Sequence, residues 1–303
     1  MKRAGLIGIG TITKDYALGL EKTKKFSLVS ICDIKDNPIG KDLFPKKTFY
    51  KDVNKMLKGE HLDMVIISTP PATHYDLIKK CFSYGVDAIV EKPCVLDISQ
   101  FSELAKIAKT NNLKFIVSYH WQNGEEVRKF NRFFDKNKIE KISIHVDDPY
   151  SKDGANINDE KIPLEGCFID SGVNAISLIK MWLPFKTFEI KNTEIIYAKN
   201  VKLPIYSHVF LDIDGVPVDI EIDWRNNKNF KCTKVVYEGR DVVINHSEQT
   251  IFDGTKIIRC SDMIRLTRHY YNFFTSLKDK SNYINSFKIH NLLLKVRDHY
   301  EVY

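Results

Sequence analysis

The sequence predicts two domains: residues 1–120 as a doubly wound parallel α/β sheet, and residues 121–303 as an α+β domain with a large, mostly antiparallel open sheet. Up to about residue 120, short apolar runs alternate with amphipathic stretches, which is typical of repeated β-α-β units. From about residue 186 the chain is rich in strands that are separated by Asp-Gly, Asn-Asn and Glu-Gly turn signals, which indicates an antiparallel meander.

Five apolar runs are candidate strands of the first sheet: 4–10, 26–33, 63–69, 87–92 and 114–120. They are apolar on both faces, as a parallel sheet covered by helices on both sides requires. Helices are expected between them. In the helix expected to begin near residue 98, Asp97 or Ser99 can cap the amino end, and Asn111–Asn112 ends the helical pattern.

The second half begins with a helix expected over roughly 122–135, a strand over 141–148 and a loop rich in Gly, Asn and Asp. An apolar helix over 166–182 follows. The remaining strands are expected at 186–199, 206–213, 216–224, 231–239 and 241–247. A final helix over 266–277 precedes a tail.

The composition, with 43% hydrophobic and 28% charged residues, is ordinary for a soluble globular protein. No apolar run reaches the ~18–20 residues of a membrane span, and MKRAGLIGIG indicates a strand, so we expect a cytoplasmic protein and no membrane partner. The lysines behind the net charge of +7 are scattered among acidic residues, so we expect no nucleic-acid partner. The six cysteines form no CxxC pair and the nine histidines no HxxxH or HExxH pair, so we expect reduced thiols and no metal.

The stretch GLIGIGTIT follows the first strand and contains part of a G-x-G-x-x-G motif. Gly8 permits a tight turn, and Gly10 lets the backbone approach a pyrophosphate at the amino end of the next helix. The third position is Thr13, where the motif has a smaller residue for helix–strand packing. The alternative interpretation is a strand–helix turn that needs glycine for its conformation only.

Asp33 ends the second strand, 23 residues after Gly10. A carboxylate at this place can accept hydrogen bonds from the adenosine ribose hydroxyls and would repel a 2′-phosphate, so it favours NAD as the cofactor. Lys35 could bind that phosphate instead, which keeps NADP as an alternative.

Two further strand ends lie at the same expected edge of the sheet. In STPPATH (68–74), Pro70 ends the strand where open α/β sheets bind ligands, and His74 either faces the cleft or caps the next helix. In IVEKPC (89–94), Glu91 and Lys92 leave a buried strand, and the following proline fixes the turn that presents the lysine. The alternative for Lys92 is a strand-end lysine that reaches water.

GLIGIG, VIISTPPATH and GVDAIVEKP at these intervals resemble the glucose–fructose oxidoreductase/inositol dehydrogenase/MocA (Gfo/Idh/MocA) family. The stretch 166–174 is similar to the family's G-x-x-x-D-x-G-x-H helix, and the resemblance covers essentially the whole chain. It implies a Rossmann domain followed by an antiparallel sheet domain. It also implies an NAD(P)-dependent dehydrogenase that acts on the CH–OH group of a sugar or sugar derivative. The open sheet would form the contacts of a homo-oligomer, a dimer or tetramer.

By this resemblance, Lys92 and Asp170 are the expected catalytic positions. The usual family histidine falls at position 174, where this chain has asparagine. That departure resembles the bacterial L-arabinose/D-galactose 1-dehydrogenases: DSGVNAISL (170–178) has their D-x-G-x-N-A pattern, and IDWRNN (222–227) resembles their DWRQ-type strand end. The resemblance to this subgroup implies oxidation of an aldose at C1 to a lactone.

The chemistry of C1 is consistent with the departure. An anomeric hydroxyl is more acidic than a ring alcohol, because the ring oxygen withdraws electron density, so it needs less help from a base. Asn174 can orient hydroxyls as both donor and acceptor. Lys92 is the predicted proton-transfer group, with a pKa lowered by burial beside the positive nicotinamide. Asp170 is the competing base, or it binds the sugar and tunes Lys92.

The predicted cofactor-binding residues lie at the strand ends and the first turn: Gly8, Gly10, Thr11, Ile12, Asp33, Thr69, Pro70, His74, Glu91 and Lys92. The predicted substrate-binding residues, for each of which a purely structural role is the alternative, are His120, Trp121, Asp147 and Asn174. Two other functions stay open. One is a dehydrogenase or reductase that acts on a ring position of a cyclitol, sugar derivative or nucleotide sugar. The other is a non-catalytic sensor that binds the cofactor.

Overall fold

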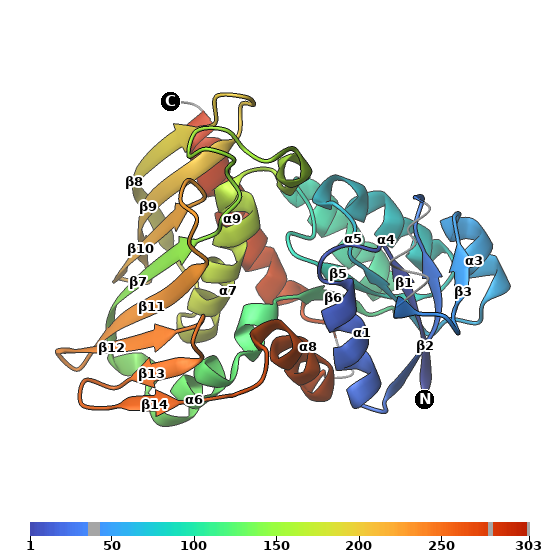
Figure 1. The fold of residues 1–303 in the computed structure, drawn as a ribbon, viewed down its shortest axis with the longest axis horizontal. Coiled ribbons are helices and arrows are strands. Elements are labelled where there is room, and N and C mark those ends of the chain that lie inside the picture. Colours follow the sequence, from blue (N-terminus) through green and yellow to red (C-terminus); the bar gives the residue numbers. More distant parts are fainter. Residues whose placement is uncertain (36–42, 278–280, 302–303) are drawn as a thin grey trace. The chain divides into compact units, whose positions relative to one another are not determined.

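The computed structural model describes residues 1–35, 43–277 and 281–301 (Figure 1). The chain divides into two compact units, Met1–His120 with Leu266–Phe287, and Trp121–Arg265 with Lys288–Tyr303. The first break between the units thus follows residue 120, where the sequence analysis placed the domain boundary. The segment 266–287 differs, because it belongs to the first unit and not to the second domain to which the sequence analysis assigned it.

The sheet of the first unit has six parallel strands in the order β3-β2-β1-β4-β5-β6. These are β1 (Lys2–Ile7), β2 (Phe26–Cys32), β3 (Thr48–Tyr50), β4 (Met64–Ile67), β5 (Asp87–Glu91) and β6 (Phe115–Ser118). This order is that of the Rossmann fold, with the topological switch between β1 and β4. The predicted fold class is therefore confirmed. The short strand β3 was not among the predicted strands.

Helices cover both faces of this sheet (Figure 1). They are α1 (Thr13–Lys22), α3 (Val53–Gly59), α4 (His74–Ser83), α5 (Ile98–Thr110) and α8 (Arg265–Ser276), with a short 3₁₀ turn η1 (Pro71–Thr73) before α4. On one face, the rings of Phe82 in α4 and Phe101 in α5 both contact Phe115 in β6. Of the two predicted caps of α5, Asp97 is the one observed, because its side chain accepts a hydrogen bond from Ser99 N.

Helix α8 covers the other face beside α1. The rings of Tyr270 and Tyr16 lie 4.2 Å apart between centroids, and Phe273 and Phe274 join the same core cluster as the strand residues Leu6, Ile31 and Ile89. Burial of these aromatic side chains is the physical reason why 266–287 joins the first unit. The sequence pattern predicted the helix and its apolar face, but an apolar face does not specify its partner.

Gly19 lets α1 approach the backbone of α8. A Cβ atom at this position would lie 2.8 Å from the carbonyl carbon of Tyr270. We predict that Gly19→Ala lowers the free energy of unfolding by about 2 kcal/mol, because a backbone contact cannot yield as a side chain can. Urea denaturation measures the change. Glu21→Ala, at an exposed position of the same helix, is the control; equal stability of the two variants would contradict this packing.

The second unit contains an eight-stranded sheet in the order β14-β13-β12-β11-β7-β10-β9-β8. Its strands are β7 (Ile139–Asp147), β8 (Phe188–Tyr197), β9 (Pro204–Ile213), β10 (Val216–Asp223), β11 (Phe230–Tyr237), β12 (Arg240–Asn245), β13 (Thr250–Phe252) and β14 (Ile257–Arg259). Neighbouring strands are antiparallel except β7 and β10, which are parallel. Two meanders, β8–β10 and β11–β14, therefore flank β7, which comes from an earlier part of the chain.

Helices α7 (Val173–Trp182) and α9 (Tyr283–Glu301) run along one face of this sheet (Figure 1). The unit also contains α6 (Glu125–Phe133), the 3₁₀ turns η2 (His120–Asn123), η3 (Lys136–Lys138) and η4 (Asp159–Leu164), and the π-helical turn η5 (Phe168–Gly172). The prediction of a tail after residue 277 was wrong, because Leu292, Leu293 and Val296 of α9 are buried. None of the helices in the described part of the chain has the length and hydrophobicity of a bilayer span.

Candidate active site

The turn after β1 has the geometry of a phosphate-binding loop. Gly8 has a φ of +91°, and a Cβ atom there would lie 2.8 Å from Cγ2 of Thr69 and 3.0 Å from the carbonyl of Ser68. A Cβ atom at Gly10 would meet nothing within 4 Å. Gly8 is therefore required by the fold, whereas Gly10 leaves open space at the amino end of α1, where a pyrophosphate binds in this fold.

Thr13 explains how the turn tolerates the lost third glycine. Its side chain is buried, and its Oγ1 accepts a hydrogen bond from Gly10 N at 2.8 Å. The next residues outward are Thr11, which is exposed, and Ile12, which is the N-cap residue of α1. The predicted residues of this turn thus lie together at the amino end of the first helix.

Asp33 follows β2 and is joined directly to the same turn. Its Oδ2 accepts a hydrogen bond from Ile9 N at 2.7 Å, and its Oδ1 accepts one from Lys35 N at 2.8 Å. An ionised carboxylate has about four acceptor sites, so two donors fix the orientation of Asp33 without exhausting its capacity to bind ribose hydroxyls.

The loop after β4 is ordered by its own hydroxyls. Thr69 Oγ1 and Thr73 Oγ1 lie 2.7 Å apart, and Pro70 is the N-cap residue of η1. Pro70 is exposed and Thr69 is half-buried at the carboxyl edge of the sheet. These two predicted residues therefore lie at the edge that also holds the glycine turn.

His74, which was predicted to bind the cofactor, lies in the interior and contacts two loops. It is completely buried, with Nε2 2.7 Å from Thr69 O and Nδ1 2.9 Å from Pro93 O. Burial lowers the pKa of His74 to about 4, against the effect of these two carbonyls. A neutral imidazole has one N–H, so it donates to one carbonyl at a time. His74 thus connects the loops after β4 and β5 through their carbonyl groups.

The low pKa of His74 predicts a pH-dependent stability. The unfolded chain binds a proton below the ordinary pKa of about 6.5, and the folded chain does so only near 4, so acid favours unfolding in this window. We expect His74 to remove about 3 kcal/mol of stability as the pH falls through the window. Urea unfolding of wild type and His74→Gln from pH 7 to pH 4 measures the difference in slope. Equal slopes would contradict the assignment.

Glu91, also predicted to bind the cofactor, points into the first unit. It is 4% exposed; its Oε1 accepts hydrogen bonds from Tyr16 OH at 2.6 Å and Tyr270 OH at 2.8 Å, and its Oε2 accepts one from Lys92 N at 3.1 Å. Burial raises the pKa of Glu91, while Lys92 and the donors oppose that effect. Lys92 itself is half-buried where β5 leaves the sheet. The carboxylate therefore supports the turn that presents Lys92.

In the second unit, Asp170 and Asn174 lie where a π-helical turn passes into α7. Residues Phe168–Gly172 form the π turn. A Cβ atom at position 172 would lie 2.9 Å from the Phe168 ring, so this position favours glycine. The sequence predicted one helix over 166–182, which includes both residues. Residues 168–172 depart from a regular α-helix, because the π turn contains more residues per turn. Such turns are frequent at functional sites.

The two polar residues differ in their environment. Asp170 is half-buried, whereas Asn174 is 5% exposed and its Oδ1 is buried without a hydrogen-bond donor among the described residues. A buried amide oxygen that lacks a donor costs free energy. An incoming hydroxyl is the natural donor for this oxygen.

An internal ion pair, not predicted from the sequence, anchors the π turn. Ser171 Oγ donates to Asp148 Oδ2 at 2.8 Å, and Asp148 Oδ1 pairs with Lys231 Nζ at 2.7 Å. Trp224 Nε1 also donates to Ser171 Oγ, at 3.3 Å. Lys231 is 4% exposed, and a lysine in an apolar strand was the available signal. This network fixes the residue next to Asp170.

The remaining predicted substrate residues are internal. His120 Nδ1 lies 3.2 Å from His269 Nδ1, and its ring stacks on Tyr270. Trp121 is 2% exposed and packs against His246. Asp147 is 4% exposed; its Oδ1 accepts from Asn226 Nδ2 at 2.9 Å and lies 3.2 Å from His145 Nε2. Within the described ranges, no three His, Cys, Asp or Glu side chains are placed to hold a metal ion.

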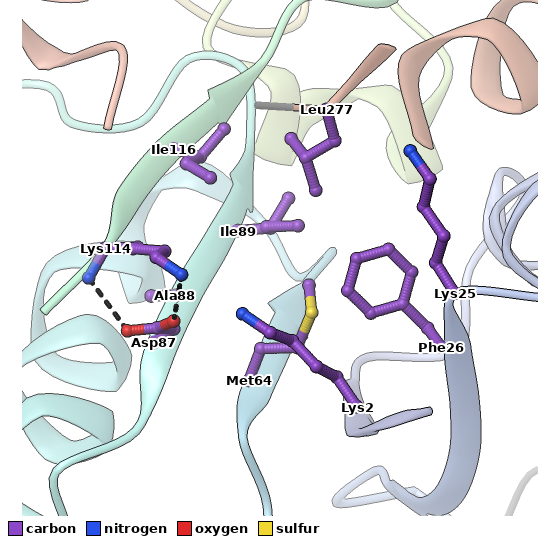
Figure 2. Close-up of a pocket in the computed structure, with 10 residues that line it drawn as sticks. All are labelled: Lys2, Lys25, Phe26, Met64, Asp87, Ala88, Ile89, Lys114, Ile116 and Leu277. Carbon is purple, nitrogen blue, oxygen red and sulfur yellow. Dashed lines mark hydrogen bonds and ion pairs between the residues drawn. The ribbon is translucent and has the colours of Figure 1, made fainter. Parts of the chain in front are cut away.

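A separate cavity of about 190 Å³ lies at the amino edge of the sheet of the first unit (Figure 2). Its floor is apolar and includes Phe26, Met64 and Ile89. On its rim, Lys114 N donates to Asp87 Oδ1 at 2.8 Å. Parallel α/β sheets bind ligands at the carboxyl edge, where the glycine turn lies, so we assign no part of the candidate site to this cavity.

Comparison with known proteins identifies the first unit. Residues 2–119 match the Gfo/Idh/MocA family, described as an oxidoreductase family with an NAD-binding Rossmann fold. This match agrees with the predicted family for the first unit, residues 2–119. The predicted subgroup of arabinose and galactose dehydrogenases is not distinguished by this match.

Individual relatives match in part. The chain is 28% identical over 108 residues to the uncharacterized oxidoreductase YdgJ of Escherichia coli strain K12. The aligned part covers 36% of this chain and 31% of that protein. It is 23% identical over 138 residues to myo-inositol 2-dehydrogenase of Thermotoga maritima, which covers 45% of this chain and 39% of that protein. The chain thus spans less than half the length of these two relatives in the matches.

Solved structures extend the similarity to the second unit. KijD10, a 3-ketoreductase from Actinomadura kijaniata in complex with NADP, aligns with a TM-score of 0.81 and 15% identity, over 98% of this chain and 97% of that one. At this identity the likeness shows a shared fold in both sheets and does not identify the substrate of this chain.

Proposed function

We propose that this protein is a sugar dehydrogenase that moves a hydride from C1 of an aldose to NAD and forms a lactone. The proposal rests on one observation above the others. Gly8, Asp33 and Lys92 follow β1, β2 and β5, and these strands are neighbours in the order β2-β1-β4-β5. Asp33 and Lys92 therefore lie on opposite sides of the glycine turn along one edge of the sheet.

This order matches the two ends of a dinucleotide. Adjacent strands are about 4.8 Å apart, so Lys92 lies about 10 Å from the turn, on the side of the switch point that the nicotinamide occupies in this fold. Asp33 lies on the adenosine side. The open space at Gly10 suits the pyrophosphate between them. The residues of the first unit thus fit the cofactor.

The chain's own residues supply the proton chemistry. When bound, the nicotinamide accepts the hydride from the substrate carbon. In our proposal Lys92 Nζ takes the proton of the same hydroxyl, so that a C=O bond forms as the C–H and O–H bonds break. Asp170 accepts a hydrogen bond from a sugar hydroxyl. Asn174 Oδ1, which has no donor among the described residues, accepts another.

The preference for C1 follows from the residue at position 174. An amide cannot take a proton, so the site has one base fewer than a histidine would give it. An anomeric hydroxyl is the more acidic alcohol of an aldose and needs less basic assistance than a ring hydroxyl. The D-x-G-x-N-A pattern at 170–175, similar to L-arabinose/D-galactose 1-dehydrogenases, supports the same choice.

NAD is the proposed cofactor in preference to NADP. The Asp33 carboxylate is held at the end of β2 by Ile9 N and Lys35 N, and its negative charge would repel a 2′-phosphate. We therefore expect Asp33→Ser to reduce the difference in KM between NAD⁺ and NADP⁺ when the two cofactors are measured side by side.

A substrate screen tests the proposed function. Purified protein is incubated with NAD⁺ or NADP⁺ and with free aldopentoses, aldohexoses, inositols and nucleotide sugars, and reduction is followed at 340 nm. We expect reduction of NAD⁺ with free aldoses and a lactone that hydrolyses to the aldonic acid. Turnover confined to inositols or nucleotide sugars would replace C1 by a ring position. Tight cofactor binding with no turnover on any polyol would make the protein a sensor.

A further inference from the structure

A cluster of buried polar side chains surrounds Glu91, the residue before Lys92. Glu91 lies in the interior of the first unit, between Tyr16 of α1 and Tyr270 of α8. The two tyrosine rings lie 4.2 Å apart between centroids, so both hydroxyls converge on the single oxygen Oε1. The segment that supplies Tyr270 is more than 170 residues away in the sequence. Side chains of α1 and α8 thus hold the carboxylate of Glu91, which directly precedes Lys92.

The three groups named above as bonded to Glu91 are all donors. Burial raises the pKa of Tyr16 and of Tyr270, so both remain hydroxyls that can donate. The backbone N–H of Lys92 is the third donor. A carboxylate that accepts three hydrogen bonds is favoured in its ionised form, which opposes the cost of burial. The three donors therefore favour a negative charge on Glu91, next to Lys92 in the chain.

We propose that Glu91 is a positioning residue for Lys92: the two tyrosine hydroxyls fix its carboxylate, which fixes the turn that presents the lysine and keeps a negative charge beside it. This inference rests on the proposed function, in which Lys92 transfers the proton. In this proposal the charge of Glu91 sets the pH at which Lys92 gives up its proton. The hydrogen bond from Lys92 N to Glu91 sets the direction in which the lysine side chain points.

The electrostatic part follows from reciprocity. The charge of Lys92 favours the ionised form of Glu91, so the charge of Glu91 must favour the protonated form of Lys92 by the same free energy. Among the described residues, the ionisable groups around the cluster include Asp15 and Tyr16 on α1, Lys92 after β5, His120 after β6, and His269 and Tyr270 on α8. Asp15 is the carboxylate among these groups, whereas Glu91 itself is adjacent to Lys92 in the chain.

Glu91→Gln tests the proposal, because it keeps the shape of the side chain and removes the charge. Lysines of wild type and variant are reductively methylated with ¹³C, and the Lys92 signal, assigned with Lys92→Arg, is titrated by NMR. We expect the midpoint of the Lys92 titration to fall by about one pH unit in Glu91→Gln. The acid limb of the kcat/KM profile should shift by the same amount. An unchanged NMR midpoint would overturn the proposal.

Two further variants separate charge from position. Glu91→Asp keeps the charge but cannot reach both hydroxyls, so we expect a midpoint near that of wild type with kcat lowered about 10-fold. Tyr270→Phe keeps the ring and the buried carboxylate, and it remains informative if Glu91→Gln does not fold. We expect it to lower kcat about 3- to 10-fold with the KM for cofactor unchanged. Wild-type kcat in both variants would overturn the positioning role.

Glu126→Gln is the matched control. Glu126 is also a fully buried carboxylate, but it lies in the second unit, 3.0 Å from His246 Nδ1. Its replacement is expected to lower stability and leave the Lys92 midpoint unchanged, and a midpoint that falls as far as in Glu91→Gln would overturn the proposal. If the NMR midpoint falls in Glu91→Gln while the pH–rate profile stays fixed, Glu91 sets the charge of Lys92 and the proposed proton transfer by Lys92 is wrong.

Discussion

Lys92→Met is expected to lower kcat at least about 100-fold on whichever aldose turns over best, because positioned acid–base groups contribute factors of about 10² to 10⁴. Methionine matches the length and apolar stem of lysine, so the turn held by Glu91 and His74 should persist. The Kd of NADH, measured by fluorescence, should change less than about threefold, since the dinucleotide is bound mainly at the glycine turn.

Lys106→Met is the control for the loss of one positive charge. Lys106 is exposed on α5 and should show wild-type kcat and Kd. Near-normal turnover of Lys92→Met with cofactor still bound would remove Lys92 from the chemistry, and Asp170 would then be the base to test next.

Gly10→Val should weaken NAD binding by at least about 100-fold, which corresponds to about 2.8 kcal/mol, and leave stability almost unchanged. A Cβ at Gly10 meets no protein atom within 4 Å, so the branched side chain would occupy only the space proposed for the pyrophosphate. Isothermal titration calorimetry gives the Kd, and urea unfolding without cofactor gives the stability. Wild-type affinity in this variant would show that the glycine turn does not bind the cofactor.

Gly8→Val is the matched opposite. It places a side chain at a φ of +91°, 2.8 Å from Thr69 Cγ2 and against the backbone of Ser68. We expect the free energy of unfolding without cofactor to fall by about 3 kcal/mol or more, because both backbone strain and overpacking act at this position. Equal stability of the Gly8 and Gly10 variants would contradict the distinct roles assigned to the two glycines.

The fold was predictable where the pattern is local. Alternation of apolar runs and helices located five of the six strands of the first sheet, and Asp97, the observed cap of α5, was one of two predicted caps. Non-local pairing was not predictable. Strand β7 pairs with both β10 and β11, and α8 returns to the first unit through Tyr270 and its neighbours. The sequence shows that such segments have apolar faces but not which faces they meet.

The candidate site shows the same limit. Residues at the carboxyl ends of strands could be placed by topology, as Gly10, Asp33 and Lys92 illustrate. Whether a side chain points toward a ligand or inward could not be read from its position. Glu91 and His74 were predicted to contact the cofactor, but each is buried and bonded to its own unit. These two remain predictions as cofactor contacts, and their observed contacts favour supporting roles.

Isotope transfer from C1 tests the central claim most directly. The protein is incubated with NAD⁺ and an aldose that carries deuterium at C1, and the reduced cofactor is analysed by mass spectrometry. We predict one deuterium in each NADH molecule formed, a lactone that lacks it, and a loss of this transfer in Lys92→Met. Reduced cofactor without deuterium would show that the hydride comes from another carbon, and bound NAD⁺ that is never reduced would show that the site performs no hydride transfer.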